Sequence, residues 1–235
     1  MLGNWYTQKF TEPYEHIIIH NFFENPENIQ LECVPDSSWV YYDNPLEKKY
    51  TKKVSGDSTF SFLQSDEFLE KMKGLTGIHD LETDPHLHGA GYAMYPNGGK
   101  LDIHLDYSIH PISGKERRCN LIVYISKDWK KEYGGGLELW NKELTHYKTV
   151  EPTWNSAIIF KTTDESWHGI PNPIECPENE YRKSIAVYYV SEPQQCTKNR
   201  PKAEFIPHPF NDVEKRYEKL YEIRKTRNII KDDFL

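Results

Sequence analysis

The stretch KLDIHLDYSIH, residues 100–110, has the alternating pattern of a strand but carries ionisable side chains. Successive side chains of a strand point to opposite faces, so His104 and Asp106 are expected to point the same way, together with Asp102. Ionisable groups on one buried face are costly unless a partner compensates them. A surface salt bridge and a bound metal ion are the two candidate partners.

A second histidine in a marked context follows in SWHGIPNP, residues 166–173, where His168 precedes a glycine and a proline-rich turn. Two histidines and one carboxylate form the facial triad of non-haem Fe(II) oxygenases, which leaves coordination positions open. H-x-D alone is a common pattern, and a solvated pair is its default interpretation. As metal ligands, His104 and Asp106 would come from one strand and His168 from a strand across the barrel.

The segment YRKSIAVYYV, residues 181–190, alternates like a strand and begins with an arginine 14 residues after His168. An arginine that faces a pocket needs an anion. A carboxylate would satisfy it, since arginine binds that group bidentately and a serine hydroxyl adds a hydrogen bond. The expected pocket face consists of Arg182, Ser184, Ala186 and Tyr188.

Together, these motifs resemble the 2-oxoglutarate/Fe(II)-dependent dioxygenases, specifically their prolyl 4-hydroxylase-like branch. The resemblance covers roughly residues 80–192. Besides H-L-D, His168 and R-K-S, it rests on three further phrases, namely YPNG at 95–98, RCNLIVYISKDW at 118–129 and GGGLELW at 134–140.

The resemblance implies a double-stranded β-helix, a jelly-roll variant, with iron in its mouth. It implies Fe(II), 2-oxoglutarate and O2, with L-ascorbate as a candidate reductant. The implied reaction hydroxylates an unactivated C–H bond and releases succinate and CO2. By similarity, the iron ligands are His104, Asp106 and His168, and the cosubstrate residues are Arg182, Ser184, Tyr124, Tyr95 and Asn120.

The substrate stays open at this point. Prolyl hydroxylases often have an aromatic residue three positions before the first histidine, where this chain has Leu101. A protein or peptide side chain such as proline is our first candidate. The alternatives are a small molecule, such as a free amino acid, sugar or lipid headgroup, and a non-catalytic metal-binding jelly roll. Arg182 with Tyr124 disfavours the last, because a metal store needs no dicarboxylate clamp.

Composition and charge argue against a nucleic-acid-binding, membrane-spanning or disulfide-bonded protein. The 235 residues carry a formal net charge of -7, whereas a nucleic-acid binder normally has a basic face. No apolar run is long enough to span a membrane. The cysteines are scattered, without a C-x-x-C pair or a visible signal peptide, so we expect a cytoplasmic protein without disulfides. The oligomeric state is open. The four cysteines are Cys33, Cys119, Cys176 and Cys196.

We expect one mainly β domain over 1–235, with an N-terminal support at 1–79, a core at 80–192 and a C-terminal extension at 193–235. Strands are expected at 14–23, 90–95, 101–106, 119–126, 136–140, 145–151, 156–161 and 182–190.

Helical segments are expected at both ends of the chain. A short helix is expected at 25–34, and another at 65–75, capped by Ser65 and ended by Gly74. Residues 40–60 suggest a long loop, which would control substrate access if it covers the site. The segment 211–235 reads as a helix packed outside the sheet, with a capping box from Asn211 and Glu214 and a stripe of Val213, Tyr217, Leu220 and Tyr221.

Two further features receive default interpretations. His86 and His88 share a strand face and form a rival metal pair, which we disfavour because no third ligand phrase follows. Arg117 and Arg118 read as a solvated turn before a strand.

Overall fold

The computed structural model describes residues 2–29, 31, 34–54, 56–194, 197–212 and 214–234. Between its strands and α-helices lie short 3-10 turns at Pro26–Asn28, Lys131–Tyr133, Lys215–Tyr217 and Lys231–Asp233. The strands and helices are β1 (Tyr6–Phe10), β2 (His16–His20), β3 (Val40–Asn44), β4 (Glu47–Lys52), α1 (Ser58–Leu63), α2 (Asp66–Thr76), β5 (Glu82–Thr83), β6 (Gly91–Tyr95), β7 (Lys100–Leu105), β8 (Glu116–Tyr124), β9 (Leu137–Trp140), β10 (Tyr147–Val150), β11 (Ser156–Lys161), β12 (His168–Ile170), β13 (Arg182–Ser191), β14 (Glu204–Phe205) and α3 (Glu218–Thr226).

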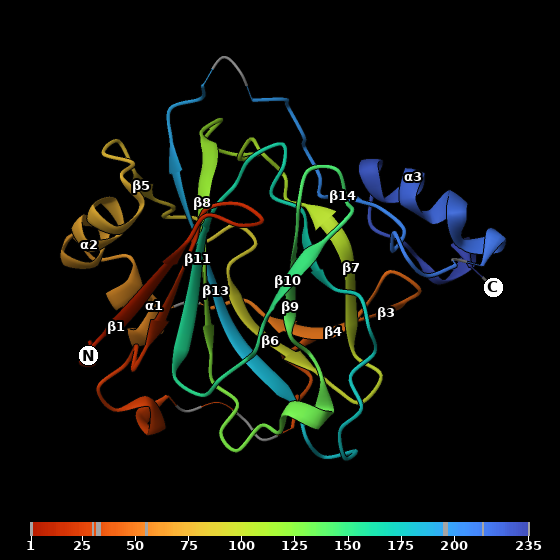
Figure 1. Cartoon of the computed structure of the whole chain (residues 1–235), viewed down its shortest axis with the longest axis horizontal. Coiled ribbons are helices and arrows are strands. Elements are labelled where there is room, and N and C mark those ends of the chain that lie inside the picture. Colours follow the sequence, from red (N-terminus) through yellow and green to blue (C-terminus); the bar gives the residue numbers. More distant parts are fainter. Residues whose placement is uncertain are drawn as a thin grey trace.

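The strands form one sheet, and every pairing in it is antiparallel. Its main path runs β1-β2-β11-β8-β13-β6-β4-β7-β12-β9-β10, with β3, β5 and β14 attached at the side. The sheet curls on itself, so that β7, β9 and β10 lie on one side of the molecule and β8, β11 and β13 on the other (Figure 1). This is the arrangement expected of a jelly roll.

Strand β8 shows how the sequence separates the two faces of this sheet. Cys119, Leu121 and Val123 are buried in the larger apolar cluster on the outer face, beneath the helices. Ile122 and Tyr124 belong instead to the cluster inside the curl. The period-two alternation of a strand therefore holds over these residues, and it turns polar Asn120 inward as well.

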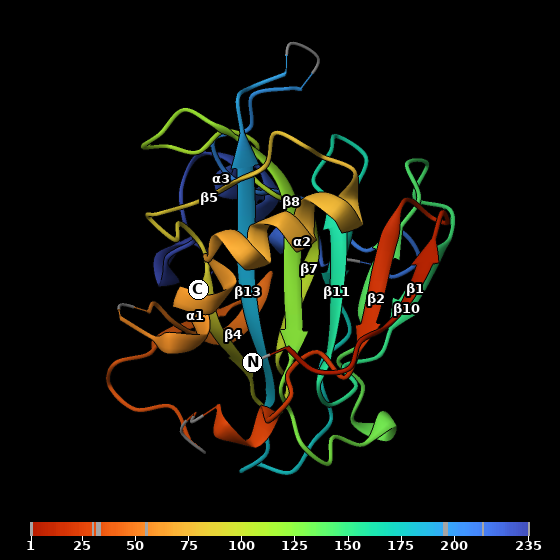
Figure 2. The same ribbon diagram turned by 90° about the vertical axis from the view of Figure 1, so that its left-hand side faces the viewer.

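Two helices cover the outer face, lying across β13, β8 and β11 (Figure 2). The expected helix is α2, and its predicted cap is confirmed, because the Phe68 backbone N–H donates to Ser65 Oγ at 3.3 Å. The predicted stop at Gly74 is wrong. The helix continues to Gly77, whose positive φ of 69° provides the left-handed ending. The preceding helix, α1, was not predicted.

Residues 40–52 are a β-hairpin rather than the predicted loop. Strand β4 pairs with β3, and it also connects β6 to β7 in the sheet because it pairs with both of them. The tyrosines explain this local preference, since Tyr41 and Tyr50 oppose each other and stack with ring centroids 4.3 Å apart. The charged Lys48 and Lys49 lie between them in the sequence, and they made this strand resemble a solvated segment.

The C-terminal helix is shorter than predicted. Helix α3 begins at Glu218, with Tyr217 at its N-cap, so the expected capping box at Asn211 and Glu214 does not start it. Val213 lies outside the described residues. The expected packing is confirmed for the rest of the stripe, because Leu220 and Tyr221 are buried against Leu46 and Phe205, with Tyr217 partly buried beside them.

Among the described residues, no helix combines the length and apolar character that a membrane crossing requires. Cys119 and Cys176 are free thiols. Cys33 and Cys196 lie outside the described residues, so the absence of disulfides stays a prediction for them.

Candidate metal centre

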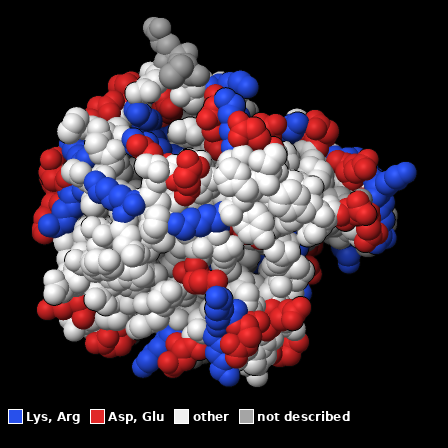
Figure 3. Space-filling view, viewed as in Figure 1, with Lys and Arg blue, Asp and Glu red and all other residues white. Residues whose placement is uncertain are grey.

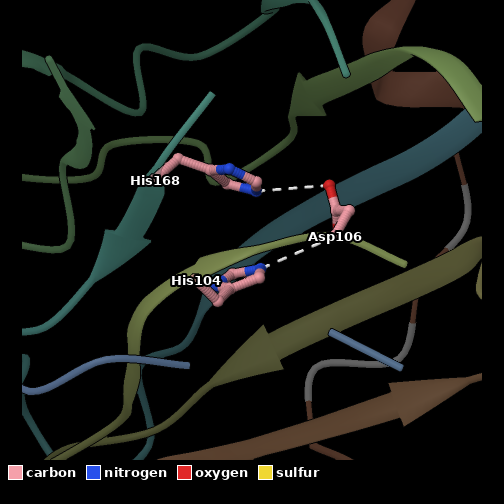
Figure 4. Close-up of side chains that lie close together, drawn as sticks. All are labelled: His104, Asp106 and His168. Atoms are coloured by element: carbon pink, nitrogen blue, oxygen red, sulfur yellow. Dashed lines mark ion pairs between the residues drawn. The ribbon is translucent and has the colours of Figure 1, made fainter. Parts of the chain in front are cut away.

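The three predicted ligands meet inside the curled sheet (Figure 4). One ligand atom from each of His104, Asp106 and His168 lies within 4.8 Å of the others, and all three side chains are buried. The His104 Nε2 atom lies 3.7 Å from Asp106 Oδ1, and the His168 Nε2 atom lies 3.5 Å from Asp106 Oδ2. Within the described part of the chain, no other group of His, Cys, Asp and Glu has this geometry.

His168 reaches the centre from a neighbouring strand and not from across the barrel, as the sequence had suggested. It begins β12, which is hydrogen-bonded to β7, and it stands directly opposite His104. The two imidazole centroids are 4.4 Å apart. Cross-strand pairing therefore brings the ligands together although 64 residues separate them in the chain.

The register of this pair also corrects the expected face of Asp102. Leu101 opposes Ile170 and His104 opposes His168, so β7 uses one residue more than β12 over the same span. Such a bulge breaks the alternation of side chains. Leu101 and His104 consequently both line the inner cavity. Asp102 instead pairs with Lys100 at 2.6 Å and accepts a hydrogen bond of 2.9 Å from the hydroxyl of Tyr221.

Both imidazoles are oriented by backbone carbonyls. The Nδ1 atom of His104 lies 2.9 Å from the Asp102 oxygen, and that of His168 lies 2.9 Å from the Ser166 oxygen. These contacts place the proton on Nδ1 and leave the Nε2 lone pair toward the centre. Burial lowers the pKa of His104 to about 3 and lowers the pKa of His168 as well. Both rings are therefore neutral, as ligands must be.

Asp106 is held as an anion by its neighbours. Burial alone would raise the pKa of its carboxyl group, but the Arg117 guanidinium and a hydrogen bond from Asn120 hold that pKa well below its usual range. Arg117 Nη2 lies 3.2 Å from Asp106 Oδ2, and Asn120 Nδ2 donates to the same oxygen at 2.7 Å. Asn120 also accepts from Arg117 Nε at 2.9 Å. The contacts of Asn120 thus favour a role in positioning Asp106 over the predicted contact with a cosubstrate.

Arg117 is buried, which contradicts the expected solvated turn. Its guanidinium lies 3.2 Å from the ring centroid of Tyr188 and 4.7 Å from that of Tyr107. The sequence hides this position because β8 has an irregularity. Tyr189 opposes Cys119 while Val190 opposes Arg117, so Arg118 is the extra residue. The interruption turns Arg117 inward on the side of Asn120.

A cavity of about 290 Å³ adjoins the triad. Its lining includes the whole predicted face of β13, namely Arg182, Ser184, Ala186 and Tyr188, together with Tyr95.

Arg182 lies deep in this cavity and is only 2% exposed. Its Nε donates to the Gly135 carbonyl oxygen at 2.6 Å, and its guanidinium lies 5.2 and 5.0 Å from the ring centroids of Tyr95 and Tyr124. No described carboxylate pairs with it. The Tyr124 hydroxyl is likewise buried without a hydrogen-bond partner in the described structure. Ser184 stands opposite Tyr124 across the β13–β8 pair.

The donor set fits the expected groups. Two neutral imidazole nitrogens and one carboxylate oxygen suit Fe(II), and three residues leave positions for further ligands. The buried Arg182 charge and the orphaned Tyr124 hydroxyl fit a carboxylate, because buried donors of this kind are normally satisfied. These two observations agree with the residues predicted for iron and with Arg182 and Tyr124 as residues for 2-oxoglutarate.

The rival histidine pair has a structural explanation. The backbone N–H groups of His86 and His88 donate to the Asp84 carboxylate at 2.9 and 2.7 Å. The same carboxylate lies 3.2 Å from His110 Nε2. Asp84 therefore closes a turn and satisfies a buried histidine, and these residues do not form a metal-binding group.

Comparison with known proteins agrees with this geometry. Residues 90–190 match the model of the 2OG-Fe(II) oxygenase superfamily. This matched segment contains the three candidate metal ligands and Arg182. The chain is 23% identical over 202 residues to the prolyl 3-hydroxylase OGFOD1 of Xenopus laevis. The alignment covers 80% of this chain and 36% of that protein. The chain thus spans about a third of the length of that relative.

Two solved structures are also similar. A Trichoplax adhaerens prolyl hydroxylase, in complex with a hypoxia inducible factor oxygen degradation domain peptide fragment, superposes with a TM-score of 0.50 and 17% identity, covering 66% of this chain and 71% of that one. A Pseudomonas putida prolyl-4-hydroxylase gives a TM-score of 0.49 and 16% identity, covering 66% and 78%. The first likeness confirms the predicted double-stranded β-helix.

Proposed function

We propose that this protein is a 2-oxoglutarate- and Fe(II)-dependent oxygenase that hydroxylates an unactivated C–H bond of a protein or peptide side chain, with proline as the first candidate. The observation that carries the proposal is the shared cavity: the metal triad and an unpaired, buried Arg182 line the same 290 Å³ space. A metal store would need only the triad. A dicarboxylate cosubstrate accounts for both.

The residues of the site have separate proposed roles. His104, Asp106 and His168 would hold Fe(II), and Arg182 would hold the distal carboxylate of 2-oxoglutarate with help from Tyr124 and Ser184. Bound iron supplies oxygen activation, coupled to oxidative decarboxylation of 2-oxoglutarate to succinate and CO2. The protein contributes orientation and exclusion of water. Arg117 and Asn120 would keep the Asp106 carboxylate ionised and in place.

The choice of a peptide substrate is supported by the Xenopus relative, which is a prolyl 3-hydroxylase, and by the peptide bound to the Trichoplax enzyme. Leu101 lines the cavity at the position where prolyl hydroxylases often have an aromatic residue, so a small-molecule substrate is the alternative that the experiment must separate. We include L-ascorbate as a reductant and a cytoplasmic location in the proposal. The free thiols of Cys119 and Cys176 are in keeping with a reducing compartment.

The test is a substrate screen on protein loaded with Fe(II) and 2-oxoglutarate without oxygen. Oxygen is then admitted, and succinate is measured with proline-containing peptides, free amino acids, sugars and lipid headgroups. Peptides are expected to stimulate succinate release and to gain the mass of one oxygen atom. The Asp106→Ala variant is the matched control, and it should release none. Stoichiometric iron binding without succinate from any substrate would favour metal storage instead.

A further inference from the structure

Part of the cavity wall comes from outside the matched residues 90–190. Strand β4 supplies Glu47 and Lys49, and the C-terminal segment supplies Phe205 and Arg224. Phe205 stacks on the imidazole of His104, with centroids 4.8 Å apart and planes inclined by 19°. The two segments therefore border the space that faces the metal ligands.

Glu47, Lys49 and Arg224 form a charged cluster in this wall. Glu47 is only 2% exposed. Its carboxylate lies 3.2 Å from Lys49 Nζ and 3.5 Å from Arg224 Nε. One carboxylate thus faces two cations, and one positive charge is left over. Arg224 Nε is buried without a hydrogen-bond partner in the described structure, so its ion pair with Glu47 leaves donor capacity unused.

The charges around the cluster do not supply the missing anion. Apart from Arg182, the cavity is lined by Lys49, Lys52, Lys53, Arg117 and Arg224, whereas Glu47 and Asp106 are its acidic residues. Asp106 belongs to the metal triad. The chain as a whole has a net charge of -7, and its outer surface mixes both signs (Figure 3). A cationic cavity in an acidic protein concentrates the field on anionic groups that enter it.

We propose that Lys49 and Arg224 bind a carboxylate of the prime substrate, and that they select substrates with an acidic group near the carbon that is hydroxylated. Glu47 pairs with both cations and competes with a substrate carboxylate for them. The inference rests on the proposed hydroxylase function and specifies its substrate. The carboxylate comes either from an aspartate or glutamate beside the target residue of a peptide, or from a free amino acid.

The test measures binding without turnover. Protein loaded anaerobically with Fe(II) and 2-oxoglutarate is titrated with fluorescent peptides that share a central proline and differ only in the flanking residues: Asp/Glu, Asn/Gln or Lys. Free proline competes in a separate arm and reports the second source of carboxylate. The acidic peptide should bind about ten-fold or more tightly than its amide counterpart, since hydrogen bonds to charged groups are the stronger ones.

Three variants assign that preference to the cluster. Lys49→Met and Arg224→Met should each reduce the preference for the acidic peptide by about ten-fold. Glu47→Gln removes the competing carboxylate and should increase the preference for the acidic peptide. General damage to the fold would weaken binding in all three, so the opposite sign for Glu47→Gln separates the two explanations. Lys48→Met is the matched control, because Lys48 lies on the same strand but does not line the cavity, and it should change nothing.

The outcomes separate the two proposals. Acidic selectivity without hydroxylation would support the carboxylate site and contradict the proposed function. Hydroxylation of amide and acidic peptides alike, with equal affinities, would support the function and overturn the carboxylate site. Failure of both the acidic peptide and free proline to bind would also overturn it, as would unchanged selectivity in Lys49→Met and Arg224→Met.

Discussion

The Asp106 carboxylate contacts three kinds of partner. It faces two imidazoles, an arginine and an amide, all of them buried. An isolated buried carboxylate would take up a proton, yet this one is held as an anion. Arg117 supplies the charge that keeps Asp106 ionised before a cation arrives. The protein itself therefore offsets part of the cost of burying ionisable groups on this strand.

The first prediction concerns Arg182. Arg182→Ala should weaken 2-oxoglutarate binding by about two orders of magnitude, because two charged hydrogen bonds of roughly 1.5–3 kcal/mol each are lost. Fe(II) binding should change little. Isothermal titration without oxygen measures both affinities. Lys127→Ala is the control, since Lys127 is exposed after β8. Equal 2-oxoglutarate affinity in parent and Arg182→Ala would remove the proposed clamp.

The second prediction concerns Glu138, a buried carboxyl group that accepts hydrogen bonds from Trp140 Nε1 at 2.9 Å and from Asn172 Nδ2 at 3.0 Å. Burial raises its pKa to about 6. The folded state thus binds this proton more tightly than the unfolded chain, where a glutamate titrates at about 4.3. The resulting stabilisation is complete below pH ~4.3 and is lost as pH rises through about 6.

Glu138→Gln removes this titration. Relative to the parent, the free energy of unfolding of the variant should rise between pH ~4.3 and ~6 and then level off. Urea unfolding of both proteins at several pH values measures the difference. A difference that stays constant across this range would contradict the shifted pKa.

At the scale of elements, the bulge in β7 explains the glycine after His168. A Cβ atom on Gly169 would lie 2.8 Å from the Leu101 oxygen and 2.9 Å from the Asp102 oxygen. Real contacts of this kind are not tolerated, so only glycine lets β12 approach the bulged strand. The close approach in turn sets His168 opposite His104.

Gly169→Ala should therefore push β12 away from β7. We expect the free energy of unfolding to fall by roughly 1–3 kcal/mol, and Fe(II) affinity to fall with it because His168 is displaced. Gly74→Ala is the matched control. Gly74 lies within α2 with nothing near its missing Cβ atom, so alanine should stabilise the protein by about 0.5–1 kcal/mol. Chemical denaturation and anaerobic metal titration measure both effects, and unchanged iron affinity in Gly169→Ala would contradict the role given to this glycine.

The sequence predicts those features that depend on regular alternation and fails where alternation is interrupted. His104 and Asp106 were predictable because a two-residue spacing repeats a strand face, and the same holds for Arg182 and Ser184. Asp102 and Arg117 were misplaced because one extra residue in β7 and one in β8 shift the faces, and nothing in the local composition marks these positions. Pairing partners are also non-local, so the adjacency of β12 to β7 has no local signal.

At the scale of the whole molecule, the strongest packing lies on the outer face of β8, β11 and β13. Cys119 is fully buried there with Leu121, Val187 and Tyr189. The metal ligands come instead from β7, the residue that follows it and β12, which do not contribute to this cluster. Disturbance of the outer cluster should therefore affect stability first and the centre only as a consequence.

The last prediction uses Cys119 as a reporter of global unfolding. Burial raises the pKa of its thiol to about 12, so the native protein should not react with a thiol reagent at this position. Labelling should require the same unfolding event that exposes the core. Mass spectrometry of labelled peptides at increasing urea concentrations should give a Cys119 transition that coincides with loss of circular dichroism. Fast labelling in native buffer would contradict the burial, and fewer than four reactive thiols after denaturation would contradict the absence of disulfides.

The position of α3 bears on how the protein matures during synthesis. Translation delivers Glu47 early, the metal ligands and Arg182 in the middle, and Phe205 and Arg224 late. A nascent chain that has just completed β13 holds the iron triad but lacks the wall that stacks on His104 and pairs with Glu47. In the folded protein, the segment that carries Phe205 and Arg224 borders the metal ligands on this side of the cavity.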